Sequence, residues 1–325
     1  MSIESGNQGQ MAIQIRERLF QRLALATTAA TYLLILVGAL VRATGSGLGC
    51  PDWPKCFGLW IPPTDVSQLP PGYDPAAFVV LQTWIEYLNR LLGAVIGLLI
   101  LATVIAALVR HRHQPRIWIP SVLAFILVLF EAWLGAKVVE HELASWAVTA
   151  HLVGAFFVVS LLLYATFSAF FPEPVARQEL SLWHRRMERL TLFIFALLLG
   201  QAGLGTSVRG AVEDKVLANP GLPRTEWLFP LMEIDIAHRQ LAVLTFLALC
   251  YLTWRARAQK NTDPWIWRAS LTCFVLVSLQ MGAGLGLAYL GMPGVLQVLH
   301  LSFGSLLFGA LTLVWLFVRR PPGRA

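Results

Sequence analysis

Five polar residues stand inside long apolar stretches of this chain, where polar groups are costly to bury. Asn89, His151, His238 and His300 each lie a few residues after the start of such a stretch, and Glu86 precedes Asn89 by three positions. Imidazole nitrogens bind iron, and a carboxylate beside an apolar pocket can transfer protons. These residue types therefore indicate metal or haem chemistry inside a membrane.

The polar positions recur at one fixed offset. Asn89 and His238 are 149 positions apart, and so are His151 and His300. Several separated pairs that share one offset predict a duplicated unit. The same offset pairs Glu86 with Asp235, Arg90 with Arg239, Glu131 with Gln280 and Gly135 with Gly284.

The composition excludes a soluble protein. The 325 residues are 57% hydrophobic and 13% charged, with a mean hydropathy of +0.64, whereas soluble domains are about a quarter charged. The net charge of +7 does not indicate nucleic-acid binding, because the basic residues lie in loops beside the apolar stretches. We expect no nucleic-acid partner.

Eight apolar stretches are long enough to cross a bilayer, which takes about 20 residues. Long unbroken runs of this kind are helical in lipid. The repeat then predicts an all-α integral membrane protein whose eight transmembrane helices form two pseudo-symmetric four-helix bundles, residues 1–171 and 187–325, joined by a cytoplasmic linker at 172–186. The expected helices are 20–41, 84–109, 117–137, 145–170, 187–208, 233–254, 265–289 and 294–318.

The distribution of charge orients the chain. Most of the 25 Lys and Arg residues lie near one set of helix ends, and such ends face the cytoplasm. We therefore expect both termini in the cytoplasm and the polar positions near the periplasmic side of a bacterial inner membrane. Cys50 and Cys56 then lie in an outer loop on the oxidising side, where a disulfide is favoured over two free thiols. Whether this pair is structural or redox-active stays open.

The histidine pattern is typical of haem binding. His238 and His300 lie on alternate helices of one bundle, so their imidazoles can bind one iron from opposite sides. In the first bundle Asn89 is a poor iron ligand, which leaves His151 as the strong one and an iron position open to chemistry. The alternative is that each histidine only hydrogen-bonds to a neighbouring helix, which the repeat disfavours.

Four arginines lie on the side that is poor in positive charge. Arg42, Arg90, Arg209 and Arg239 could bind haem propionates through bidentate hydrogen bonds; the alternative is contact with lipid headgroups. Glu86 could transfer protons at the edge of the apolar site, or only stabilise the start of its helix.

These residues resemble the haem A synthase family over nearly the whole chain. The resemblance rests on Glu86-Tyr-Leu-Asn-Arg90, His151, His238-Arg239, His300 and the segment Gly38-Ala-Leu-Val-Arg-Ala-Thr-Gly-Ser-Gly-Leu-Gly-Cys-Pro-Asp-Trp-Pro-Lys-Cys56. It departs from the family at Asn89, where many members have histidine.

The resemblance implies that the C8 methyl of haem O is oxidised to a formyl group, which makes haem A for cytochrome oxidase. It implies haem b as cofactor between His238 and His300, haem O as substrate at His151, Glu86 as the essential glutamate, and a Cys50–Cys56 disulfide. The implied partners are haem O and the protohaem farnesyltransferase that makes it, a membrane electron acceptor, and cytochrome oxidase subunit I or its assembly factors. A homo-oligomer is left open.

Two other functions fit parts of the pattern. A di-haem electron-transfer protein of cytochrome b type would use the same histidines without changing a porphyrin. A transporter built from repeats would place its polar groups near the middle of the membrane, whereas here they gather near one surface.

Overall fold

The structure is a computed structural model that describes residues 2–171, 181–229 and 233–320, with side chains described from Glu17 onward. The described residues form helices and loops, with one isolated bridge between Cys56 and Leu59. The long helices are α1 (Ser2–Ala43), α2 (Val80–Arg110), α3 (Pro115–Glu140), α4 (Ser145–Phe170), α5 (Leu182–Ala218), α6 (Glu233–Ala256), α7 (Pro264–Tyr289) and α8 (Gly294–Arg319). Short 3-10 turns are η1 (Val66–Gln68), η2 (Pro75–Ala77), η3 (Arg224–Glu226) and η4 (Arg257–Gln259).

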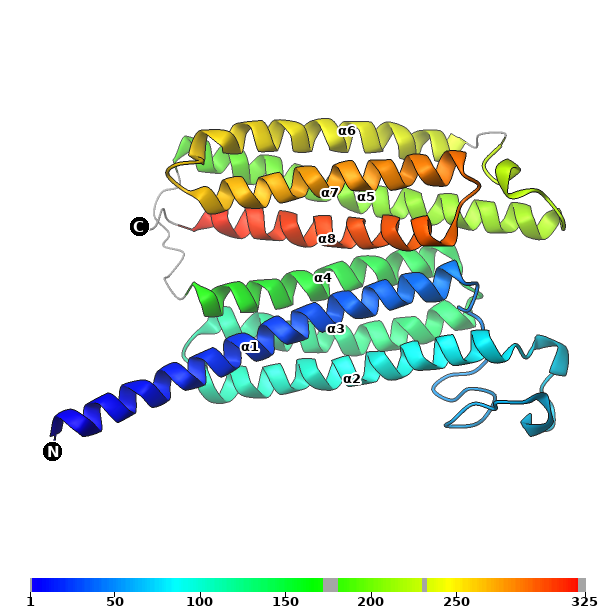
Figure 1. The fold of residues 1–325 in the computed structure, drawn as a ribbon, viewed down its shortest axis with the longest axis horizontal. Coiled ribbons are helices and arrows are strands. Elements are labelled where there is room, and N and C mark those ends of the chain that lie inside the picture. The colour runs from blue at the N-terminus through cyan, green and yellow to red at the C-terminus, as the bar shows by residue number, and fades with distance from the viewer. Residues whose placement is uncertain (1, 172–180, 230–232, 321–325) are drawn as a thin grey trace.

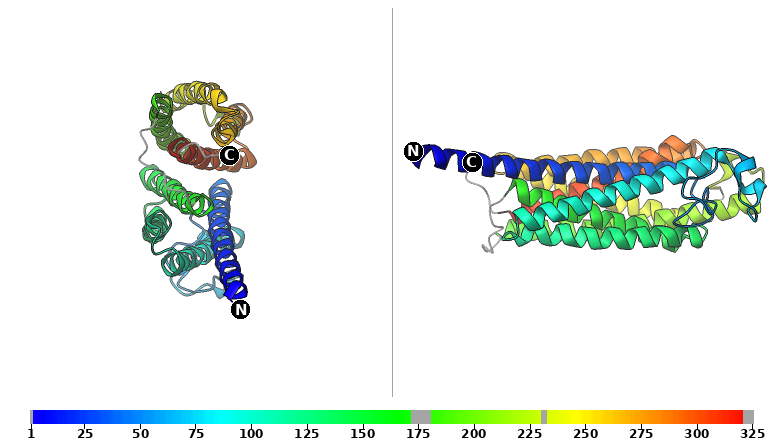
Figure 2. Two further views of the ribbon diagram at one scale, coloured as in Figure 1. Left: turned by 90° about the vertical axis from the view of Figure 1, so that its left-hand side faces the viewer. Right: turned by 90° about the horizontal axis from the view of Figure 1, so that it is seen from below.

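The helices form two groups of four that lie side by side (Figures 1 and 2). In each group consecutive helices pack on one another, and the fourth packs on the first. The groups meet where α8 packs on α1 and α4, and where α4 packs on α5. There, Phe156 of α4 stacks on Phe308 of α8 with ring centres 4.8 Å apart. All eight helices are long and apolar enough to cross a membrane, which confirms the predicted multi-pass, all-α class.

Helix α5 is longer at both ends than the predicted 187–208. It begins at Leu182, so the end of the expected linker is helical, and it continues to Ala218. The glycines that would be expected to end it, such as Gly205 and Gly210, lie against side chains of α6 and α4 instead. Packing therefore outweighs their low helix propensity. The rest of the expected linker, 172–180, lies outside the described residues.

Two other helices start earlier than predicted. Helix α1 begins at Ser2 rather than near residue 20, and α2 begins at Val80 rather than at 84. At α1 the added residues are largely polar and precede the apolar stretch, so hydropathy gives no signal there. At α2 the added residues are the single turn Val80–Thr83. The long α1 projects beyond the other helices at its N-terminal end (Figure 1).

The loop of residues 44–79 folds against the start of α2. It contains the predicted disulfide between Cys50 and Cys56. Both cysteines are buried with Phe57 and Phe78 in a small core of the loop's own. Gly49 lies so close to the backbone at the start of α2 that a Cβ would not fit. The loop is thus held at the same helix ends as the predicted site residues.

Candidate functional site

The two histidines of the second half face one another. His238 of α6 and His300 of α8 have ring centres 6.4 Å apart, with their planes at 65°. His300 Nδ1 lies 3.0 Å from the carbonyl oxygen of Gln280 on α7. A carbonyl oxygen can only accept, so Nδ1 donates and the lone pair is on Nε2. In this structure Nε2 lies 3.3 Å from the side-chain amide nitrogen of Gln280, which would have to move for a metal to bind there. The structure therefore brings these two predicted ligands together.

The surroundings of these imidazoles fit a haem. A metal-bound imidazole nitrogen lies about 2 Å from its metal, so two such rings on one metal have centres about 6 Å apart. Each imidazole lies against a glycine: a Cβ on Gly205 would come 3.2 Å from His238 Cε1, and one on Gly284 would come 3.2 Å from His300 Cε1. Within the described ranges no three His, Cys, Asp or Glu residues gather to hold a metal ion by themselves. The spacing of the two rings is therefore that of two imidazoles on one metal.

The first half has a different set of polar groups at the matching positions. His151 of α4 lies with Nδ1 2.7 Å from Oε2 of Glu131 on α3, and that glutamate side chain is only 7% exposed. Asn89 of α2 has a buried Oδ1 without a hydrogen-bond partner among the described residues. Gly135 lies beside His151, where a Cβ would be 3.6 Å from Cε1. A histidine and an asparagine therefore stand at the sequence positions that match His300 and His238 of the second half, and iron binding by His151 stays a prediction.

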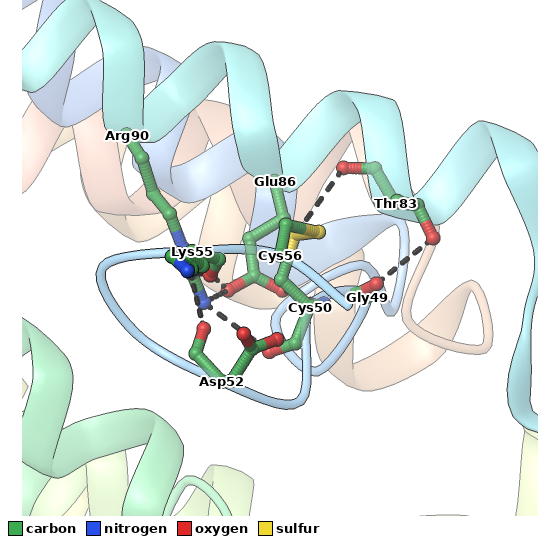
Figure 3. A network of polar contacts seen from close by, with 8 residues as sticks. All are labelled: Gly49, Cys50, Asp52, Lys55, Cys56, Thr83, Glu86 and Arg90. Carbon is green, nitrogen blue, oxygen red and sulfur yellow. Dashed lines mark hydrogen bonds and ion pairs between the residues drawn. A yellow bond between two sulfur atoms is a disulfide. The ribbon is translucent and has the colours of Figure 1, made fainter. Parts of the chain in front are cut away.

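Glu86 and Arg90 join helix α2 to the disulfide loop (Figure 3). The Glu86 carboxylate is buried; it accepts the backbone N–H of Cys50 at 2.9 Å and pairs with Arg90 at 2.5 Å. Arg90 in turn donates to the backbone oxygens of Asp52 at 2.6 Å, Lys55 at 2.9 Å and Cys50 at 3.2 Å. Glu86 is therefore not an exposed first-turn residue, because protein donors fix its carboxylate under the loop.

The other three predicted arginines also pair with carboxylates. Arg239 lies 2.9 Å from Asp235, four residues before it on α6. Arg42 of α1 and Arg209 of α5 share Glu213, at 2.7 Å and 3.0 Å. Glu213 thus links the two halves at the end of the molecule that carries the site. Binding of these arginines to haem propionates stays a prediction.

Two important carboxylates have no role in the sequence-based prediction. Glu213 falls in a stretch that is expected to be a loop, although its spacing of four residues from Arg209 is typical of a helical ion pair. Glu131 enters the sequence pattern only as the repeat partner of Gln280. For Glu131 the sequence does contain one signal. A lone glutamate within an apolar helix needs a polar partner when it is buried in a membrane.

Comparison with known proteins places the chain in a family. The family model described as "Cytochrome oxidase assembly protein" (COX15-CtaA) matches residues 21–312. A "Heme A synthase" of Shewanella oneidensis is 29% identical over 87% of this chain and 91% of its own length. Similar proteins with the same name occur in Exiguobacterium, at 27% identity over 86% of this chain and 87% of the relative, and in Shouchella clausii, at 25% over 92% and 97%.

The family match covers all eight membrane-spanning helices apart from the outermost residues, and so includes both halves and the disulfide loop. The resemblance predicted from the sequence is thereby confirmed, and haem is implicated in the chain's activity. The chain belongs to the COX15-CtaA family of cytochrome oxidase assembly proteins, as a homologue of haem A synthases.

Proposed function

We propose that this chain is a haem A synthase that oxidises the C8 methyl group of haem O to a formyl group. The observation that carries the proposal is the asymmetry of the two halves: an opposed histidine pair in one, and a single histidine with an asparagine at the matching position in the other. Conversion of a methyl to a formyl group with oxygen from water releases four electrons and four protons. The chain therefore needs an electron relay and an outside acceptor as well as a substrate site.

The second half, residues 187–325 with the added turn from Leu182, is proposed to hold haem b between His238 and His300. Haem b would supply one-electron transfer there. The histidines orient the group, and the glycines beside them leave room for the rings. The neutral Gln280 carbonyl holds His300 in one tautomer.

The first half, residues 1–171, is proposed to bind haem O through His151. Asn89 leaves the opposite side of the porphyrin without a strong ligand. Glu86 is the proposed acid or base: it lies three residues before Asn89 and is held in one orientation by Arg90 and Cys50. Arg42, Arg90, Arg209 and Arg239 are proposed to face the propionates of the two haems.

The proposed orientation puts the loop of residues 44–79 in the periplasm and both termini in the cytoplasm. Its support is the basic residues at the opposite helix ends and the Cys50–Cys56 disulfide, which persists in an oxidising compartment. In Figure 1 the first residues of α1 and the last residues of α8 lie at the end of the molecule away from this loop. Haem O synthase and cytochrome oxidase subunit I or its assembly factors are the proposed partners upstream and downstream.

The test is haem extraction and mass analysis from a bacterial host that makes haem O but no haem A. Haem A is expected only when the chain is expressed, and His151→Ala should abolish it while the haem b spectrum remains. A purified protein with two haems and unchanged haem O in the host would instead support the cytochrome b-type carrier.

A further inference from the structure

We propose that Glu131 is a positioning residue whose carboxyl group, in close contact with His151, makes the substrate haem site electronically different from the cofactor site. The inference rests on the proposed function, in which His151 binds the iron of haem O. Neither the repeat nor the motif at Glu86 assigns a role to Glu131.

The first observation is the contact itself. Glu131 Oε2 lies 2.7 Å from His151 Nδ1, and the glutamate side chain is 7% exposed. The contact has the distance of an ion pair but not the angles of a hydrogen bond. A carboxylate at that distance favours a hydrogen on Nδ1, which leaves Nε2 to bind metal. A charged partner also raises the basicity of the imidazole as a ligand, which is the usual arrangement around metal-binding histidines.

The second observation is a space that only glycine leaves open. A Cβ on Gly154 would overlap the Glu131 carboxyl group. Gly154 follows His151 by three residues on α4, so the carboxylate lies against the backbone of the helix turn after the histidine. The missing side chain of Gly154 thus leaves a recess on α4 that the Glu131 carboxyl group fills, close to His151.

The third observation is the contrast with the second half. At the matching position Gln280 offers His300 a neutral backbone carbonyl, at 3.0 Å from Nδ1. The two sites therefore differ in two ways. His151 has a carboxyl group beside it where His300 has an uncharged partner, and the first half has Asn89 where the second half has His238. A stronger donor at the first site favours oxidised iron there, whereas Gln280 gives His300 an uncharged partner.

The neighbouring surface limits what else Glu131 could bind. Glu131 borders an open apolar groove of about 580 Å³ between α3 and α4, with Leu127, Leu134 and Phe157 among its walls. Lys137, at the outer end of this groove, pairs with Glu140 instead.

The test uses full-length protein carrying haem b, titrated with ferrous haem O. Two readouts are taken at bound haem O: the iron–histidine stretching band in resonance Raman spectra and the midpoint potential. Glu131→Gln should keep haem O binding, shift the band to lower frequency and raise the potential. Haem b in the same molecule is the internal control, and its spectrum also reports folding.

Gly154→Ala is the second variant, because it keeps the charge but fills the recess, and it should reproduce both shifts. Gly97→Ala is its matched control, since a Cβ there meets nothing within 4 Å, and it should change neither readout. If Glu131→Gln lost haem b, that variant would be misfolded, and the two readouts would be taken from Gly154→Ala alone. Unchanged band and potential in both variants, with binding still dependent on His151, would overturn the role of Glu131 alone. Binding of haem O that persists in His151→Ala would overturn the proposed substrate site as well.

Discussion

Arg90 and Glu86 form a buried ion pair at 2.5 Å, four residues apart on α2, and each also binds the backbone of the disulfide loop. The pair is therefore a joint between the loop and the helix that carries Asn89. Because both charges are largely buried, removal of either leaves the other without compensation.

Arg90→Ala should loosen the loop and destabilise the protein by roughly 3 kcal/mol, the usual effect of breaking a buried pair. Thermal unfolding in detergent and protease cleavage within residues 44–79 measure the two effects. Arg239→Ala is the matched control, because its pair with Asp235 has the same spacing but a more exposed arginine. Equal protease sensitivity in both variants would contradict a specific joint at Arg90.

Glu86→Gln should abolish haem A formation. The variant should lose some stability because Arg90 loses its charged partner, but the loop should stay folded, because the amide oxygen can still accept the N–H of Cys50 and Arg90 keeps its backbone acceptors in the loop. Haem analysis of the expressing cells measures the loss, and protease resistance shows that the loop is intact. Thr83→Val serves as the comparison: it removes the hydrogen bond from Thr83 to the Gly49 carbonyl at 2.8 Å without touching the carboxylate. If Thr83→Val lost as much haem A as Glu86→Gln, Glu86 would act only through the loop.

The disulfide closes a short loop of sequence separation 6, so its stabilising effect should be modest. Chain-entropy arguments give about 2 kcal/mol for such a loop. The double variant Cys50→Ser, Cys56→Ser should lower the unfolding temperature only slightly. Its yield of haem A should nevertheless fall clearly, because the Cys50 N–H orients Glu86. Parallel measurement of both quantities checks this, and full activity in the double variant would show that the disulfide is dispensable for the site.

Glu213 should matter for the packing of the two halves. Glu213→Gln removes the shared partner of Arg42 and Arg209 and leaves two cations close together. Since the glutamate is 31% exposed, we expect a loss of about 1–2 kcal/mol in stability. Differential scanning of detergent-solubilised protein measures it. Glu188→Gln, which alters another ion pair across helices at 3.5 Å, should have a smaller effect; the reverse order would contradict the linking role of Glu213.

The sequence predicted the architecture well, because two signals agreed. Hydropathy located the eight helices, and the shared offset of His238 and His300 from Asn89 and His151 predicted which helices must correspond. The disulfide followed from the compartment. These features depend on composition and spacing, which a linear sequence contains.

What could not be predicted depends on packing between helices. Gly205 and Gly210 suggest an end to α5, but each lies against a neighbouring helix that stabilises the helical backbone. A helix α5 that ended near residue 208 would leave Glu213 in a loop, so its ion pair with Arg42 could not be predicted. Likewise, nothing in the spacing of Glu131 and Gly154 shows that one fills the space left by the other.

Asn89 provides the sharpest test of the difference between the halves. With haem O bound, the wild-type protein should show one low-spin haem, at His238 and His300, and one high-spin haem, at His151. Asn89→His should convert the second signal to low spin, because it restores on α2 the ligand that α6 supplies in the second half. Asn89→Leu is the control and should stay high-spin. Magnetic circular dichroism or electron paramagnetic resonance distinguishes the states, and two low-spin haems in the wild type would show that His151 has a strong partner other than Asn89.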